Sequence, residues 1–86
     1  MKDEELLSNL LDLAKSLQFD VRFDRGSFRD GSCRLENKNI IVLNRSSPAA
    51  RKVAALTKAL SDQSLEGVFL LPAVREAIDR AKTTEP

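Results

Sequence analysis

The chain has 86 residues, of which 42% are hydrophobic and 31% are charged, and its formal net charge at neutral pH is +1. This length and composition are typical of one globular domain and argue against disorder. With no histidine and a single cysteine, the chain has no histidine-dependent nucleophile or general base, none of the common zinc sites and no intramolecular disulfide, so we expect a non-enzymatic protein without catalytic residues, cofactor or metal.

The first two elements are predicted from a change of hydrophobic period near residue 18. Leucines at three- and four-residue steps over residues 3–17 predict an amphipathic helix, and the acidic side chains of its first turn complement the helix dipole. From residue 19 the period becomes two, because Phe19, Val21 and Phe23 alternate with charged residues. This alternation predicts a strand with one buried and one exposed face.

Two further strands are predicted on either side of a turn at residues 37–39. Glycine-containing residues 25–31 form the loop that precedes them. Cys33 then alternates with Leu35, which predicts that both face inward and that Cys33 is a small core residue rather than a reactive thiol. Residues 40–43 are apolar throughout, so we expect this strand in the middle of the sheet or covered on both faces.

Two helices complete the chain. Ser46-Ser47-Pro48 predicts the start of a helix that runs to residue 61, since serine can cap free amides and proline suits the first helical position. Residues 68–71 are expected to be extended because proline follows them, and Pro72 opens a third helix to about residue 82. The last residues, 83–86, are expected to form a frayed tail.

The fold class predicted from these elements is α+β, in the order α-β-β-β-α-α, as one domain over residues 1–82. The simplest assembly is a three-stranded antiparallel meander with the helices packed on one face. Two registers between the first two strands remain open. One places Asp24 opposite Arg34 and forms favourable charge pairs; the other places Asp24 opposite Ser32 and matches apolar residues better.

The charge distribution is the one anomaly of this sequence. Residues 21–58 hold nine Lys or Arg and three acidic residues, a net charge of +6 in a nearly neutral chain. The second helix contains no acidic residue, so it cannot neutralise itself. Pairing with the acidic first or third helix is the commoner explanation, and an anion or nucleic-acid footprint is the alternative. The candidate binding residues are Arg25, Arg29, Arg45, Arg51, Lys52 and Lys58, with Phe28 as a candidate for base stacking.

A second candidate surface is apolar. The first helix carries leucines over a wide arc, and the segment before the third helix is a bulky apolar run, Val68, Phe69, Leu70 and Leu71. Either feature can close a small core or form an interface with a second copy or another protein. The sequence therefore favours a non-enzymatic protein-interaction module, with a nucleic-acid or anion binder as the alternative.

Four stretches carry a resemblance to known proteins: Gly31-Ser32-Cys33-Arg34-Leu35, residues 40–44, residues 53–60 and residues 69–75. The chain resembles a family of short uncharacterised bacterial proteins, which implies no particular activity. A strand hairpin followed by a helix also resembles the minimal zinc-peptidase core, whose helix carries H-E-x-x-H. Thr57, Lys58 and Ser61 stand at the corresponding positions, so this resemblance implies a version without metal or chemistry.

The sequence also predicts a cytoplasmic protein with no membrane partner. Its N-terminus, Met1-Lys2-Asp3-Glu4-Glu5, is too acidic for a signal or transit peptide. The longest apolar runs, residues 40–43 and 68–71, are far too short to span a bilayer. A small secreted domain usually relies on disulfides, which this chain cannot form.

Overall fold

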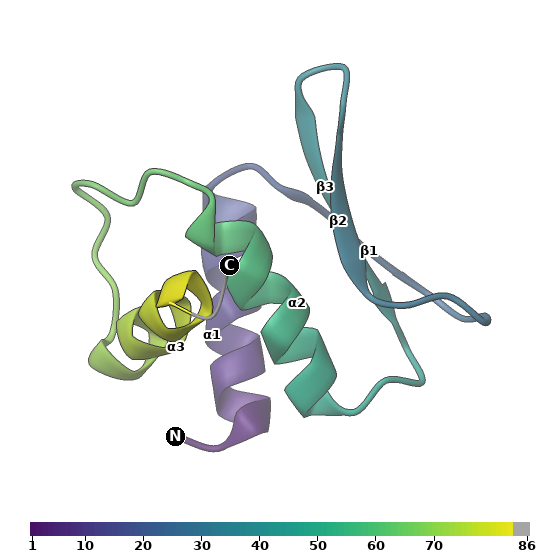
Figure 1. Cartoon of the computed structure of the whole chain (residues 1–86), viewed down its shortest axis with the longest axis horizontal. Coiled ribbons are helices and arrows are strands. Elements are labelled where there is room, and N and C mark those ends of the chain that lie inside the picture. Colours follow the sequence, from purple (N-terminus) through teal and green to yellow (C-terminus); the bar gives the residue numbers. More distant parts are fainter. Residues whose placement is uncertain (84–86) are drawn as a thin grey trace.

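The computed structural model describes residues 1–83. The helices and strands follow one another along the chain in the order α1 (Asp3–Ser16), β1 (Asp20–Asp24), β2 (Gly31–Leu35), β3 (Lys38–Asn44), α2 (Ala49–Ser61) and α3 (Pro72–Thr83) (Figure 1). The predicted α+β class is therefore confirmed. The tail predicted for residues 83–86 is wrong at Thr83, which belongs to α3, and residues 84–86 lie outside the described part of the chain.

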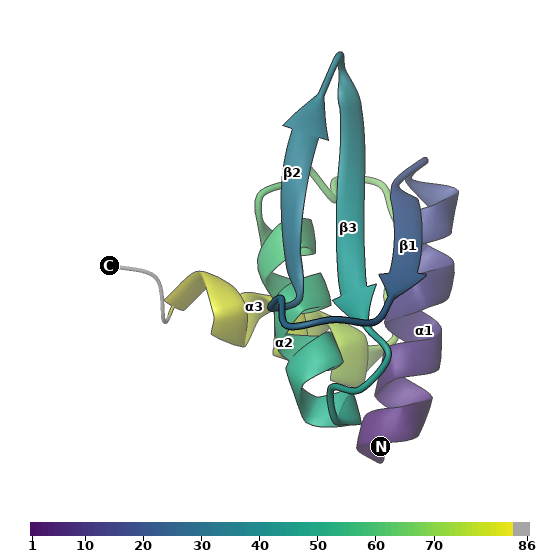
Figure 2. The ribbon, with the colours of Figure 1, turned by 90° about the vertical axis from the view of Figure 1, so that its right-hand side faces the viewer.

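The sheet is mixed, with the strand order β1-β3-β2 (Figure 2). β2 and β3 form an antiparallel hairpin, whereas β1 runs parallel to β3. The predicted antiparallel meander is wrong, and neither register proposed between β1 and β2 exists because these strands are not neighbours. A central position gives β3 hydrogen-bonding partners along both of its edges, which a strand as apolar and as buried as this one requires. The prediction of residues 40–43 in mid-sheet is confirmed.

The hairpin turn explains why β2 and β3 pair with each other. Glu36 and Asn37 at its tip have positive φ angles of 49° and 69°. Positive φ at both central residues is the requirement of a two-residue type I′ turn, whose twist matches that of the two strands. Before this hairpin, residues 25–30 connect β1 to β2 in a loop that passes the end of β3 (Figure 2).

All three helices lie on the same side of the sheet (Figures 1 and 2). α1 packs against β1, and α2 packs against β2 and β3, whereas α3 packs on α1 and α2. The core between these layers is mainly aliphatic and draws on Leu10 of α1, Ile41 and Leu43 of β3, Leu56 of α2 and Ile78 of α3. Apolar residues at helical spacing on the three helices supply most of it, as their periodicity predicts.

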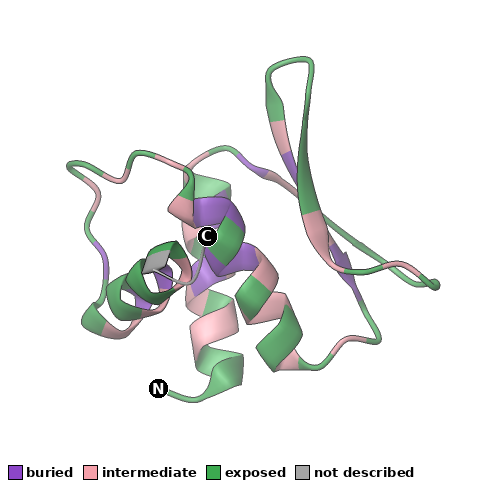
Figure 3. Cartoon of the chain, viewed as in Figure 1, coloured by how far each residue is buried: buried purple, intermediate pink, exposed green. Residues whose placement is uncertain are grey.

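Cys33 lies outside this core, so its predicted burial is wrong. It is paired with Ile40, and paired residues of an antiparallel ladder point to the same face. Because the neighbouring Ile41 belongs to the core, Ile40 and Cys33 face the side without helices. Leu35, also predicted to face inward, is 61% exposed. The hairpin projects beyond the helices, so its outer half stays exposed on both faces (Figure 3).

Candidate functional site

Asn44, the last residue of β3, ties the loop of residues 25–30 to the turn that leads into α2. Asn44 is buried, with only 6% of the residue exposed. The Nδ2 amide donates to the carbonyl oxygens of Gly26 and Phe28, at 2.9 and 2.8 Å. The Oδ1 atom accepts from the backbone N–H of Ser46 at 3.0 Å. These bonds fix the loop and the turn relative to each other.

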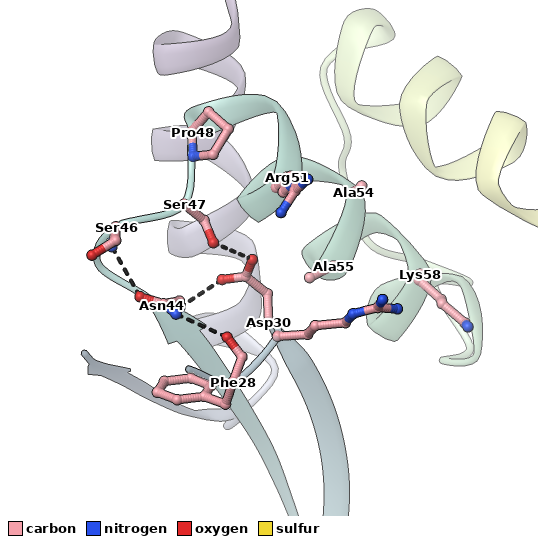
Figure 4. Close-up of a pocket in the computed structure, with 11 residues that line it drawn as sticks. Phe28, Asp30, Asn44, Ser46, Ser47, Pro48, Arg51, Ala54, Ala55 and Lys58 are labelled. Carbon is pink, nitrogen blue, oxygen red and sulfur yellow. Dashed lines mark hydrogen bonds between the residues drawn. The ribbon is translucent and has the colours of Figure 1, made fainter. Parts of the chain in front are cut away.

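Asp30 closes the same arrangement from the loop side (Figure 4). Its carboxylate accepts from the backbone N–H of Asn44 at 2.6 Å and from the Oγ hydroxyl of Ser47 at 2.7 Å. Ser47 was predicted to help cap α2, but Pro48 is the N-cap residue and α2 has no side-chain cap there. The hydroxyl of Ser47 donates to Asp30 instead, in a hydrogen bond that the charge of the carboxylate strengthens.

An open cavity of about 640 Å³ lies beside these hydrogen bonds. The loop residues Phe28 to Asp30 form one wall, and the β3–α2 turn forms another. The third wall is one face of α2, formed by Arg51, Ala54, Ala55 and Lys58 (Figure 4). Residues three, four and seven apart share a helix face. The two alanines between the cationic side chains are small, so they leave the space that forms the cavity.

Three of the predicted basic residues, Arg29, Arg51 and Lys58, line this basic cavity, as we call it from here on. The side chains of Arg29 and Arg51 form no ion pair or hydrogen bond with residues 1–83. Asp30 is the acidic residue of the lining, and both of its oxygens already accept hydrogen bonds. The cavity wall is therefore rich in positive charge and in hydrogen-bond donors.

The other three predicted basic residues surround the β3–α2 turn outside the cavity. The guanidinium of Arg45 lies over the ring of Phe23, 5.7 Å from its centroid. The Nζ ammonium of Lys52 donates to the backbone carbonyl of Arg45 at 3.4 Å. Arg25 begins the loop, next to Asp24, whose carboxylate accepts from the backbone N–H of Arg25. None of these three cationic side chains forms an ion pair within residues 1–83.

The expected pairing of the second helix with the acidic helices is therefore not found for Arg51 and Lys52, and Arg25, Arg29 and Arg45 likewise form no ion pair within residues 1–83. Two ion pairs each join residues of one element: Arg22 with Asp20 in β1, at 2.8 Å, and Arg80 with Glu76 in α3, at 2.6 Å. The hydrogen bond and the charge of Asp20 raise the pKa of Arg22. This strand arginine is thus an ordinary ion-pair partner and takes no part in the basic surface.

The predicted apolar interface, residues 68–71, is divided between the core and the surface. Leu70 is 9% exposed and belongs to the core, whereas Phe69 is 83% and Leu71 40% exposed. Phe69 and Leu71 border a shallow hollow on α1, where Leu13 contributes to the floor. Only part of this segment is therefore available to a partner.

Three residues of the site were not among those predicted from the sequence: Asp30, Asn44 and Ser47. Asn44 had a recognisable signal, because it is a polar residue directly after four apolar ones and yet belongs to the same strand. Its partners lie 16 and 18 residues earlier in the chain. No local pattern links such distant positions, so only the folded chain identifies them.

Comparison of this chain with protein-family models, with curated proteins and with solved structures finds no match. Both resemblances noted in the sequence therefore stay predictions. Within residues 1–83 no helix is both long and apolar enough to cross a membrane. The same part of the chain brings no three cysteine, aspartate or glutamate side chains into a group that could hold a metal ion.

Proposed function

We propose that this protein binds phosphate-bearing anions in the basic cavity. The observation that carries the proposal is the convergence of Arg29 and Arg51, without ion-pair partners in residues 1–83, on one cavity that Lys58 also lines. Guanidinium groups present several N–H donors in a plane and bind phosphate oxygens in pairs. Phosphate is thus the anion that fits this donor set best.

The way the site is built supports binding as well. Asp30, the acidic residue of the lining, holds Asn44 and Ser47, so its charge is directed into the protein scaffold. The loop that carries Arg29 is fixed by the amide of Asn44 on both Gly26 and Phe28. A cationic side chain on a fixed loop loses less conformational freedom on binding than one on a mobile loop.

The experiment is a calorimetric titration with inorganic tripolyphosphate at about 50 mM salt, where screening of surface charge is weak. We expect measurable binding that weakens as the salt concentration rises. The double variant Arg29→Ala/Arg51→Ala should bind at least about tenfold more weakly, since hydrogen bonds between charged groups contribute about 1.5–3 kcal/mol each.

The matched control removes the same charge elsewhere. Arg34 on β2 and Arg75 on α3 are exposed and lie outside the lining of the cavity. The variant Arg34→Ala/Arg75→Ala should therefore bind tripolyphosphate almost as the unchanged protein does. Equal losses in the two double variants, or no binding at low salt, would show that the cavity is not a phosphate site.

A protein-interaction function is the second candidate, and the observation that favours it is the 83% exposure of Phe69. A phenylalanine exposed to this extent, beside a hollow, is typical of contact with a partner. Sedimentation equilibrium over a wide concentration range tests self-association through this surface. A dimer that is lost in Phe69→Ser would support the candidate, and a monomer at all concentrations would exclude a homodimer.

A further inference from the structure

We infer that the phosphate-bearing ligand is single-stranded nucleic acid, an inference that rests on the function proposed above. The cavity alone would suit any small phosphate compound. Two further observations narrow the choice. Cationic side chains without an ion pair in residues 1–83 also lie outside the cavity, namely Arg25, Arg45 and Lys52. Two aromatic residues, Phe23 and Phe28, are partly exposed near these cations.

Phe28 lines the basic cavity beside Arg29 and is half-buried. Its backbone carbonyl accepts from Asn44, which holds the residue in place. Gly26 packs closely on the ring, because a Cβ atom at Gly26 would lie 3.2 Å from the ring carbon Cδ1, and its φ of +154° is a conformation that side chains rarely adopt. The ring is therefore held by close packing on a fixed loop at the edge of the cavity.

Phe23 is the second accessible ring, 37% exposed although it belongs to a strand. The guanidinium of Arg45 lies over it at 5.7 Å from the centroid, within the range of a cation–π contact. Arg25 and Lys52 lie close to Arg45. The backbone N–H of Arg45 donates to the carbonyl oxygen of Asp24, the residue before Arg25, and the Nζ ammonium of Lys52 donates to the carbonyl oxygen of Arg45. Each ring thus stands beside its own group of cations, one group inside the cavity and one outside it.

This alternation of cations and rings matches the chemistry of a single strand. Successive phosphates need positive charge, and the unpaired bases between them need aromatic faces for stacking. A duplex hides the faces of its bases, so it could use only the cations. A mononucleotide carries one base and would reach one of the two groups. A single strand can use both groups at once, in a way that tolerates different sequences.

Fluorescence provides a direct test, because the chain contains no tryptophan and no tyrosine. In Phe28→Trp the indole is the only strong fluorophore, at the position predicted to stack. An oligothymidylate of about ten nucleotides should quench its emission on binding, since a stacked base lies on the ring. Saturating tripolyphosphate should fill the cavity without such quenching. Phe69→Trp, on the exposed apolar segment, is the control and should not respond to either compound.

Affinity measurements on leucine variants provide a second, independent test. Phe28→Leu and Phe23→Leu keep an apolar side chain but remove the stacking surface. Each should weaken oligothymidylate binding roughly tenfold, the effect typical of one stacked base. Phe23 lies outside the lining of the cavity, so Phe23→Leu should leave tripolyphosphate binding unchanged. For the unchanged protein, about five phosphate contacts should make the single-strand affinity fall roughly a hundredfold between about 50 and 200 mM salt.

The possible results separate this inference from the proposed function. Binding of tripolyphosphate together with equal affinity for single strand and duplex, and no quenching in Phe28→Trp, would overturn the single-strand inference and leave the anion site standing. Absence of tripolyphosphate and oligothymidylate binding at low salt would overturn both. Quenching by the oligonucleotide, weaker oligothymidylate binding in both leucine variants and unchanged tripolyphosphate binding in Phe23→Leu would together establish single-stranded nucleic acid as the ligand.

Discussion

The side chain of Asn44 uses both of its N–H donors and its oxygen, and it does so at a buried position between the loop and the turn that frame the basic cavity. An amide can serve two carbonyls and one N–H at once, which neither leucine nor aspartate can do. The residue therefore determines where the loop carrying Phe28 and Arg29 lies.

At the scale of the residue we predict that Asn44→Ala lowers the free energy of unfolding by about 2–3 kcal/mol, because it leaves two carbonyls and one N–H without their partner in a partly buried place. Urea unfolding followed by circular dichroism measures the change. Asn39→Ala is the matched control: Asn39 belongs to the same strand, is half-buried and makes no side-chain hydrogen bond within residues 1–83. Equal losses in the two variants would contradict this role of Asn44.

In the segment between α2 and α3, neighbouring apolar residues serve different purposes. Leu70 is buried against the three helices, whereas Phe69 is exposed beside it. An extended chain sends successive side chains to opposite sides, so this run of apolar residues cannot be buried as a whole. Residues 68–71 therefore close the core through some of their side chains and leave others on the surface.

At the scale of the element we predict that Leu70→Ala lowers the free energy of unfolding by about 2–4 kcal/mol, since it opens a cavity in the core. Phe69→Ala should change it by no more than about 0.5 kcal/mol, as is usual for exposed positions. Chemical denaturation measures the free energy of unfolding of both variants, and each variant is the control for the other. A large loss in Phe69→Ala would mean that this side chain is packed rather than available to a partner.

Across the whole molecule, positive charge gathers around the basic cavity and the β3–α2 turn, and the acidic residues there do not neutralise it. Arg25, Arg29, Arg45, Arg51 and Lys52 form no ion pairs within residues 1–83. Mutual repulsion between cations destabilises a folded chain slightly, and a bound anion removes it. The same charges that would attract a phosphate ligand therefore link its binding to the stability of the fold.

At the scale of the whole molecule we predict that tripolyphosphate at about ten times its dissociation constant adds about 1.4 kcal/mol to the free energy of unfolding. For a domain of this size that corresponds to a rise in Tm of roughly 5–10 °C. Calorimetric scans with and without the compound measure the rise. Sodium chloride at equal ionic strength is the control. The variant Arg29→Ala/Arg51→Ala should show the same Tm in tripolyphosphate as in sodium chloride. An equal rise with sodium chloride would indicate general screening.

The elements of this protein could be predicted from its sequence because local patterns determine them. Leucine spacing identifies α1, the apolar run of residues 40–43 identifies the central strand, and proline at residue 72 marks the start of α3. The excess of positive charge over residues 21–58 is likewise visible without a structure. Each of these features depends on neighbours within a few positions along the chain.

Only the tertiary structure decides which strands pair, and the basic cavity depends on that pairing. Period-two alternation defines the faces of a strand but does not identify its neighbours, so it could not indicate that β3 lies between β1 and β2, or that Cys33 faces away from the helices. Placing β1 parallel to β3 requires a loop across the end of β3, where Asn44 and Asp30 fasten it. The basic cavity exists because this crossing brings Arg29 to the same face of α2 that carries Arg51 and Lys58.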